Sequence, residues 1–319
     1  MKSIVLIIPY FGKLPSYFNM WLMSVKYNPA VDFCVLTDDT WQGDLPENVK
    51  VVQMDWKQNV EMVRHICGSD IVLYEPYKLC DYRPAYGEIY RDYIKGYDFW
   101  GHCDFDLIFG DIRAFLTEDV LEKYDRIFTR GHFCLYRNQK DINELYRKTS
   151  AYQGINYIDA FHTKYSCHFD EGYTIKSVFM DYGKGTYDAI CFADVLYNNY
   201  NFKLAQDVEG KNAPQIYEWK EGKLCRLRIE QDSLLRDEFM YIHLQKRAMK
   251  NSVQKPESGF VIVPNEFCEW KKIERADILE NSVNSEEYVK KYKRMRIRNI
   301  WKNIRNGALM FRLKGKLKA

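Results

Sequence analysis

The sequence predicts an α/β protein with a mixed, mostly parallel sheet flanked by helices, because three features occur together in its first half. Short apolar runs typical of buried strands alternate with segments of helical periodicity. Their order of strand, helix, strand, strand, helix indicates parallel strands joined by crossover helices. An aromatic-rich run at 97–111 then leads into two carboxylates one residue apart, as expected at the ligand-binding edge of such a sheet.

Apolar spacing predicts the elements of this half in turn. The expected strands are 4–8, 32–37 and 49–54, and the expected helices are 18–28 and 57–67. Pro84 fits the first position of a further helix that continues to about Ile94. The run 97–111, YDFWGHCDFDLIFGD, is predicted as the next strand and its exit.

The second half contains fewer regular patterns. Thr117 is a candidate N-cap for a short helix through Tyr124. Between 138 and about 210 the pattern is mixed and rich in tyrosine. The remaining expected elements are a strand HFCLYR at 132–137, a hairpin at 217–228 and a strand at 239–244.

Two aspartates carry the strongest chemical signal. On a strand, Asp104 and Asp106 face the same side and project from the carboxyl edge of the sheet. Two hard oxygen ligands in this arrangement suit Mg²⁺ or Mn²⁺, with the diphosphate of a substrate completing the coordination. A bare Asp-x-Asp more often only caps a turn, but the buried strand, the Gly110 turn and Asp111 favour the metal site here.

Composition limits the class of protein. A chain of 319 residues, 46% of them hydrophobic, can bury one large core with a small appendage. Its nine cysteines are scattered without a Cys-x-x-Cys pair, so we expect neither a disulfide framework nor a zinc site, and we infer a cytoplasmic location. The early run SIVLIIPYF lacks a signal-peptide cleavage pattern, and no uncharged apolar run reaches membrane-spanning length.

The C-terminal tail differs from the body in charge. Residues 288–319 contain 12 Lys and Arg and no acid, whereas the rest of the chain holds 35 basic against 44 acidic residues. An apolar stripe at helical spacing lies between cations; the stripe is Ile297, Ile300, Trp301, Ile304, Ala308 and Phe311, and the cations are Arg296, Arg298, Lys302, Arg305 and Arg312.

This pattern predicts a basic amphipathic helix held peripherally on the anionic inner face of the plasma membrane. The alternative is a helix packed on the body, and Gly307 argues against one uninterrupted helix. A nucleic-acid partner is not expected, because the acidic body offers no basic groove.

Several segments together resemble the GT-A class of nucleotide-sugar glycosyltransferases, and more narrowly a bacterial family that acts in polysaccharide clusters. These segments are IIPYFG, PYKLCD, RPAYG, DFWGHCDFDLIFGDI and GHFCLYRN. The resemblance implies a Rossmann-like GT-A domain at 1–250, followed by an extension at 251–287 and the helical basic tail at 288–319. It also implies transfer of a hexose from a nucleotide sugar, expected to be a UDP-sugar, to a hydroxyl of a surface-polysaccharide or lipid-linked glycan.

The resemblance assigns donor-binding roles to individual residues. The loop after the first strand and the acidic end of the second hold the base and ribose in GT-A enzymes, which implies Pro9, Tyr10, Asp38 and Asp39 here. An ordinary strand-end turn explains the two aspartates equally well. The metal ligands implied are Asp104, Asp106 and His243, and the cations implied near the diphosphate are Lys78, Arg83, Lys246 and Arg247. The alternative for Lys78 and Arg83 is that they are ordinary solvated charges on the protein surface and do not bind the diphosphate.

Asp170 and Glu171 are the candidate bases that take a proton from the acceptor hydroxyl. Inverting GT-A enzymes use a carboxylate for this step, commonly from an acidic pair that opens a helix, and GYTIKSVF follows Glu171. Compensation of the helix dipole explains the pair as well. The aromatic-rich motif that usually precedes such a pair is not evident, so both inversion and retention at the anomeric carbon stay open, with inversion expected.

Two other functions stay open. In an aspartyl phosphatase of the HAD type, Asp104 would be the nucleophile, but Leu107 and Ile108 stand where that class has Gly and then Thr or Val. A non-catalytic module that binds glycans or membranes is the third possibility. Metal-dependent hydrolysis of a sugar donor would separate this module from the transferase.

Overall fold

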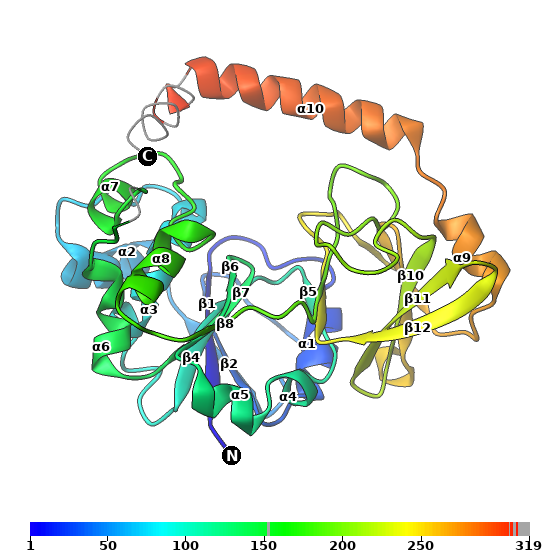
Figure 1. Ribbon diagram of the computed structural model, residues 1–319, viewed down its shortest axis with the longest axis horizontal. Coiled ribbons are helices and arrows are strands. Elements are labelled where there is room, and N and C mark those ends of the chain that lie inside the picture. The colour runs from blue at the N-terminus through cyan, green and yellow to red at the C-terminus, as the bar shows by residue number, and fades with distance from the viewer. Residues whose placement is uncertain (152–153, 306, 309–310, 312–319) are drawn as a thin grey trace.

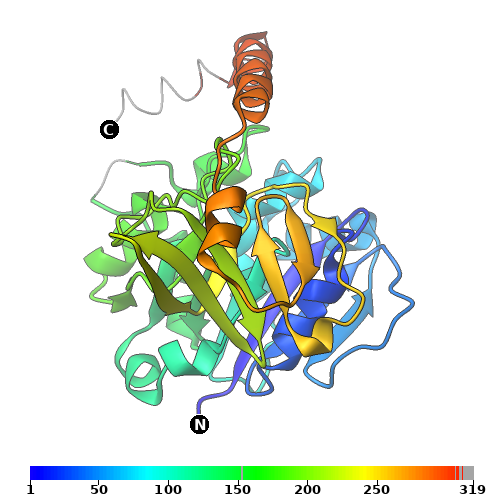
Figure 2. The same cartoon turned by 90° about the vertical axis from the view of Figure 1, so that its right-hand side faces the viewer.

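The structure is a computed structural model of the chain, and it describes residues 1–151, 154–305, 307–308 and 311. A large α/β lobe lies beside a smaller, strand-rich lobe, and helix α10 (Glu286–Arg305) crosses above both (Figure 1). The view turned by 90° also shows α10 standing above the body (Figure 2).

A seven-stranded sheet confirms the predicted α/β class with a mixed, mostly parallel sheet. Four of its six strand pairings are parallel. In spatial order the strands are β3 (Val49–Gln53), β2 (Asp32–Thr37), β1 (Ile4–Tyr10), β4 (Phe99–Cys103), β7 (Phe133–Arg137), β6 (Arg126–Arg130) and β8 (Thr186–Tyr187).

Alternating side chains of β1 divide the core between the two faces of this sheet. Val5 and Ile7 pack into one cluster, whereas Ile4, Leu6 and Ile8 pack into the other. The first face is covered by α2 (Trp56–Cys67), the 3₁₀ segment η1 (Pro76–Ala85), α3 (Tyr86–Ile89), α6 (Lys140–Asn143), η2 (Leu145–Arg147), α7 (Tyr157–Phe161) and α8 (Tyr173–Asp181). The second face is covered by α1 (Phe18–Lys26), α4 (Ile112–Phe115) and α5 (Glu118–Lys123).

The smaller lobe contains a six-stranded sheet of order β12 (Ser233–Phe239), β11 (Lys223–Glu230), β10 (Gln215–Lys220), β15 (Phe260–Val263), β16 (Glu266–Glu269) and β14 (Lys250–Asn251). In the chain, the 3₁₀ segment η3 (Pro256–Ser258) lies between β14 and β15, and α9 (Arg275–Asn281) follows β16. Because β15 pairs with β10, the range predicted as an extension, 251–287, shares a sheet with residues before position 250.

A three-stranded sheet joins the two lobes, in the order β5 (Leu107–Phe109), β13 (Tyr241–His243) and β9 (Ala193–Asp194). It brings together three segments that are far apart in the sequence. Its strand β5 begins directly after the Asp104–Asp106 turn, so this small sheet positions the candidate site.

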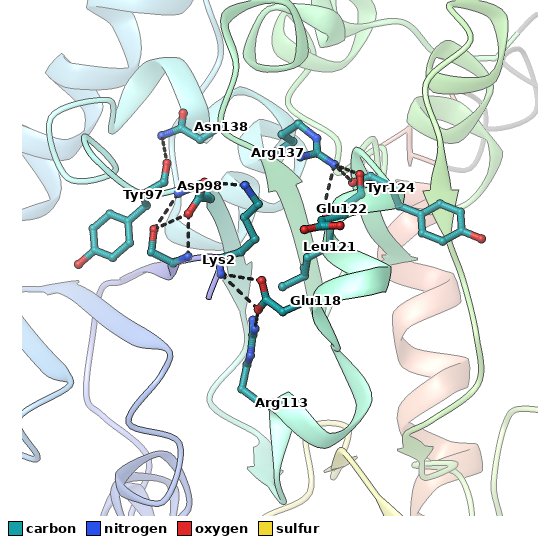
Figure 3. A network of polar contacts seen from close by, with 11 residues as sticks. Lys2, Tyr97, Asp98, Arg113, Glu118, Leu121, Glu122, Tyr124, Arg137 and Asn138 are labelled. Carbon is teal, nitrogen blue, oxygen red and sulfur yellow. Dashed lines mark hydrogen bonds and ion pairs between the residues drawn. The ribbon is translucent and has the colours of Figure 1, made fainter.

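Polar contacts tie down the amino ends of β1 and β4, away from the carboxyl ends where the aspartates lie (Figure 3). The Asp98 carboxylate accepts hydrogen bonds from the backbone N–H and hydroxyl of Ser3, at 2.9 and 3.0 Å. The Arg137 guanidinium donates to three backbone carbonyls around α5, those of Leu121, Glu122 and Tyr124. These side chains hydrogen-bond the backbone near the amino ends of β1 and β4. The candidate site lies at the opposite, carboxyl end of these strands.

Two local predictions were wrong. Pro84 lies inside η1 and does not start a helix to Ile94; the α-helical part is only Tyr86–Ile89. The run 97–111 is also not one strand, because β4 ends at Cys103 and β5 begins at Leu107 after a turn.

The tail forms the predicted helix over Glu286–Arg305, and Gly307 follows it with a positive φ of 81°. Ile297, Ile300, Trp301 and Ile304 are exposed along one side of α10, whereas Ala308 is buried. Arg312 lies outside the described residues. Among the residues that are described, no helix has the length and apolar character needed to cross a membrane.

Candidate metal and donor site

Phe105 is the anchor that places the two aspartates. Its side chain is buried and contacts the rings of Tyr10, Phe18 and Trp21, with centroids 4.9–5.2 Å away. Because Phe105 points into the core, the residues before and after it are held at the carboxyl end of β4. The backbone N–H of Asp104 also donates to the His132 carbonyl at 3.0 Å, which fixes the turn against β7.

His243 reaches the aspartates from β13. Its Nε2 lies 3.5 Å from Oδ1 of Asp106, and its Nδ1 lies 2.8 Å from Oδ1 of Asp194 on β9. A carboxylate on one ring nitrogen leaves the other nitrogen directed at the candidate metal position, as in carboxylate–histidine–metal arrangements. Burial alone would lower the pKa of His243, but Asp106 and Asp194 raise it to about 10.

The donor atoms present fit a divalent cation. One ligand atom each from Asp104, Asp106 and His243 lies within 4.8 Å of the others. Among the described residues, the buried Oδ1 of Asp106 has only the 3.5 Å ion pair with His243 and no hydrogen-bond partner, and the buried Nε2 of the neighbouring His132 has no hydrogen-bond partner either. A bound cation would satisfy the orphaned carboxylate oxygen, and two carboxylates with one imidazole suit Mn²⁺ or Mg²⁺.

Arg83 connects this turn to the acidic pair. Its Nη1 donates to the Gly131 carbonyl at 2.6 Å and to Oδ2 of Asp170 at 2.9 Å, and its Nη2 forms an ion pair with Asp104. Burial opposes its charge, yet Asp104 and Asp170 hold the pKa of Arg83 above its usual range. Arg83 is therefore a fixed cation beside the carboxylates and no solvated surface charge.

The acidic pair at 170–171 splits into two different groups. Asp170 is fully buried, and burial raises its pKa to about 6 although Arg83 lowers it. The Glu171 side chain is 48% exposed, and a contact with His168 lowers its pKa despite partial burial. Arg83 and His243 contribute to the same lowering of the pKa, so Glu171 is the ionised, accessible member of the pair.

A cavity of about 570 Å³ opens at this edge of the sheet. Its lining includes Pro9, Tyr10 and Tyr17 together with Arg83, Asp104, Asp106 and Lys246. The backbone N–H of Lys246 donates to Oδ2 of Asp106 at 2.8 Å. Small-molecule sites have volumes of about 300–1,000 Å³, so the cavity has room for a nucleotide sugar.

Other predicted donor-site residues hold loops. Asp38 and Asp39 accept backbone N–H groups of Gly12 and Leu14 at 2.7 and 2.8 Å, so they shape the loop after β1. Lys78 is buried, and Nζ donates to Asp81 and to the carbonyls of Ala160 and Tyr165. Arg247 is 4% exposed and donates to carbonyls of the 196–201 loop. The predicted contact of Lys78 with a diphosphate is therefore corrected: all three donors of its ammonium group are already used.

Three residues at the site were missed by the sequence analysis. They are Gly131, His132 and Asp194. A Cβ on Gly131 would lie 2.3 Å from Oε1 of Glu171, so only glycine lets this carboxylate rest against the turn between β6 and β7. Gly131 and His132 open the segment GHFCLYRN, which the sequence analysis singled out without assigning these two residues a role. No sequence pattern marks Asp194, because its position depends on the pairing of β9 with β13.

Comparisons with known proteins give one family match. A family model described as "Family of unknown function (DUF6625)" matches residues 6–271. No curated protein matches the chain. Among solved structures, the glycosyltransferase GlyE of Streptococcus pneumoniae TIGR4 is similar, with a TM-score of 0.30 and 12% identity over 59% of this chain. The match spans 45% of the GlyE chain, less than half of its length.

Proposed function

The chain belongs to this family of unknown function, DUF6625, and we propose that it is a metal-dependent glycosyltransferase that uses a nucleotide sugar, expected to be a UDP-sugar. One observation carries the proposal. Two carboxylates that line a cavity of about 570 Å³ have oxygens within 4.8 Å of an imidazole nitrogen, and a fixed arginine and a lysine line the same cavity. This combination suits a nucleoside diphosphate, which requires both a divalent cation and positive side chains.

The donor binds with its base toward Pro9 and Tyr10 and its diphosphate toward the aspartates. Tyr10 offers a ring for stacking, and Lys246 and Arg83 offer positive charge on the diphosphate side of the cavity. Asp104, Asp106 and His243 would hold a divalent ion, which would supply neutralisation of the charge on the nucleoside diphosphate leaving group.

Glu171 is the general base in this proposal, and Asp170 is a positioning residue. The acceptor hydroxyl gives its proton to the Glu171 carboxylate while its oxygen forms a bond to the anomeric carbon. The bond from that carbon to the diphosphate oxygen breaks, and its electron pair leaves with the diphosphate. Attack from the side opposite the leaving group inverts the anomeric carbon. Asp170 keeps Arg83 oriented through the 2.9 Å ion pair.

The acceptor in this proposal is a surface-polysaccharide or lipid-linked glycan at the inner face of the plasma membrane. The support is α10, which carries exposed Ile297, Ile300, Trp301 and Ile304 among cations and no buried residue. Such a helix lies in an anionic bilayer surface with its apolar side inserted.

Calorimetric titration with UDP and with GDP, each with and without Mn²⁺, tests the donor site. We expect UDP binding that requires Mn²⁺ and is lost in the double variant Asp104→Asn, Asp106→Asn. Asp119→Asn, an exposed aspartate of α5, is the matched control and should bind as the wild type does. If neither nucleotide binds under any condition, the proposal fails, and an aspartyl phosphatase or a non-catalytic glycan binder becomes the function to test.

A further inference from the structure

A second cavity of about 940 Å³ lies between α10 and the body of the protein. Lys246, Arg247 and Ala248 line both this cavity and the donor cavity, so the two spaces meet at the loop that follows β13. A ligand in the second cavity would therefore adjoin the Asp106 side of the donor site. Nothing in the proposed function so far uses this space.

Tyrosines hold α10 over the cavity. The Tyr288 hydroxyl donates to the carbonyl of Tyr197 at 3.0 Å. The Tyr197 and Tyr292 rings meet at 5.2 Å between centroids, and the Tyr200 and Tyr288 rings meet at 5.7 Å. Tyr197, Tyr288 and Tyr292 also line the cavity, so its wall includes several aromatic rings.

The charge of the cavity is of one sign. Lys291, Arg294 and Arg298 of α10 line it together with Lys246 and Arg247 of the body, and no described lining residue is acidic. Within the described part of the chain, the three α10 cations form no ion pair with a carboxylate. Five cations, with no acidic residue in the described lining, indicate a space suited to an anion.

The two sides of α10 differ in chemistry. The cavity side carries residues at helical spacing, among them Tyr288, Lys291, Tyr292 and Arg298. The other side of α10 is exposed and apolar, and its residues recur three or four positions apart: Ile297, Ile300, Trp301 and Ile304. The cavity side of α10 can therefore contact a ligand while the apolar, exposed side contacts a membrane.

We propose that this second cavity binds the acceptor, and that the acceptor is an anionic glycan carrying a phosphate or a carboxylate. The inference rests on the proposed transferase function, since it names the substrate class of the same site. Sugar rings pack on Tyr288 and Tyr292, and the anionic group pairs with Lys291 and Arg298. The loop at Lys246 is where the acceptor hydroxyl passes into the donor cavity.

Binding of small probes to the full chain tests this assignment without any nucleotide. Saturation-transfer NMR would compare glucose 6-phosphate, glucuronic acid and glucose. We expect the two anionic sugars, or one of them, to bind roughly tenfold more tightly than glucose, which separates phosphate from carboxylate recognition. Lys291→Gln with Arg298→Gln should abolish this preference. The matched control, Lys293→Gln with Lys302→Gln, removes the same charge from α10 outside the cavity and should retain it.

Equal binding of all three sugars overturns the assignment, and so does an equal loss in the two double variants, which would indicate a general charge effect of α10. Mn²⁺-dependent UDP binding is measured on the same proteins. A cavity variant that binds UDP normally but no longer prefers anionic sugars supports the acceptor site. Wild-type protein that prefers anionic sugars but binds no nucleotide leaves the anion site standing and refutes the transferase.

Discussion

Asp194 is a single residue on which the orientation of the His243 ring depends. Its carboxylate contacts Nδ1 of His243 and also accepts a hydrogen bond from Gln245 at 2.6 Å. In Asp194→Asn, the weaker amide acceptor no longer fixes which nitrogen faces Asp106. We expect Mn²⁺ affinity, measured by electron paramagnetic resonance, to fall about 10–100-fold.

The control for this prediction is Asp207→Asn, because the Asp207 side chain is 92% exposed and its carboxylate pairs only with Lys211 in the described structure. Asp207→Asn removes the same negative charge, but at a position away from the His243 ring. Mn²⁺ affinity that is unchanged in Asp194→Asn would show that His243 does not ligate the ion.

Gly131 controls the place of the Glu171 carboxylate. Its Cβ would overlap Oε1 and Cγ of Glu171, at 2.3 and 2.8 Å, so the flexible glutamate must swing away in Gly131→Ala. The Cβ would also lie 2.9 Å from Oδ2 of Asp170, which must shift by a smaller amount. We expect kcat for sugar transfer to fall about 100-fold, the low end of what general bases contribute, with little change in melting temperature. Steady-state kinetics and thermal unfolding measure the two effects.

Gly185→Ala is the matched glycine control, because its Cβ would meet neighbours only at 3.4 Å or beyond. A kcat that is the same in both variants would argue that Glu171 is not the base. A large loss of melting temperature in Gly131→Ala would show that the turn, and not Glu171, absorbs the extra methyl group.

At the scale of single elements, α10 offers the clearest test of membrane binding. The double variant Ile300→Glu, Trp301→Glu replaces two exposed apolar side chains, each worth about 1.5–3 kcal/mol when fully buried. We expect partitioning into vesicles with anionic lipid to fall more than about a hundredfold. Co-sedimentation with phosphatidylglycerol vesicles measures this.

Leu234→Glu serves as the control, because Leu234 is an exposed apolar residue on β12 outside α10. Wild-type protein that stays in the supernatant at low salt would contradict the membrane proposal outright. Equal losses of vesicle binding in Leu234→Glu and in the α10 variant would show that the added negative charge alone, and not the lost apolar contact, weakens binding.

Elements with strong local patterns were predictable, and elements shaped by distant contacts were not. The strand Asp32–Thr37 and the helix Trp56–Cys67 match their expected ranges within a residue, because apolar spacing and the Asp55–Gln58 capping box define them locally. The segment Pro76–Ala85 instead folds as a 3₁₀ turn, because Lys78 and Tyr82 bind backbone carbonyls near α7. No local pattern encodes those partners.

At the scale of the whole molecule, the candidate site depends on segments that approach only in the folded chain. Asp104 and Asp106 were visible in the sequence because they end an apolar run. Asp194 joins them through the β9–β13 pairing and His132 through the β4–β7 pairing. Long-range strand pairing therefore sets the limit of what spacing alone could predict here.

The stability of the molecule should depend on pH through Asp237, whose carboxylate stabilises two buried arginines of β11. Oδ2 of Asp237 accepts from Arg226 at 2.6 and 2.9 Å and from Arg228 at 2.8 Å. Burial works to raise the pKa of Asp237, but the hydrogen bonds from Arg226 and Arg228 lower it below its usual value. Glu230 and Glu209 also pair with Arg228, so Arg226 depends most on Asp237.

A carboxyl whose folded pKa is lowered contributes stability above its unfolded pKa of about 3.9, and the contribution disappears as pH falls through the folded value. We expect Asp237→Asn to lower the free energy of unfolding by about 2–3 kcal/mol at pH 7, below the usual cost of a broken buried pair because Asp237 is one-third exposed. Urea unfolding at pH 7 and pH 3 should show the difference from wild type shrinking at the lower pH.

The control is Glu238→Gln, because the exposed Glu238 carboxylate lies 3.8 Å from Lys223. This variant should change the free energy of unfolding by less than about 0.5 kcal/mol. A difference for Asp237→Asn that stays constant between the two pH values would mean that packing of the side chain, and not its charge, holds the arginines in the sheet.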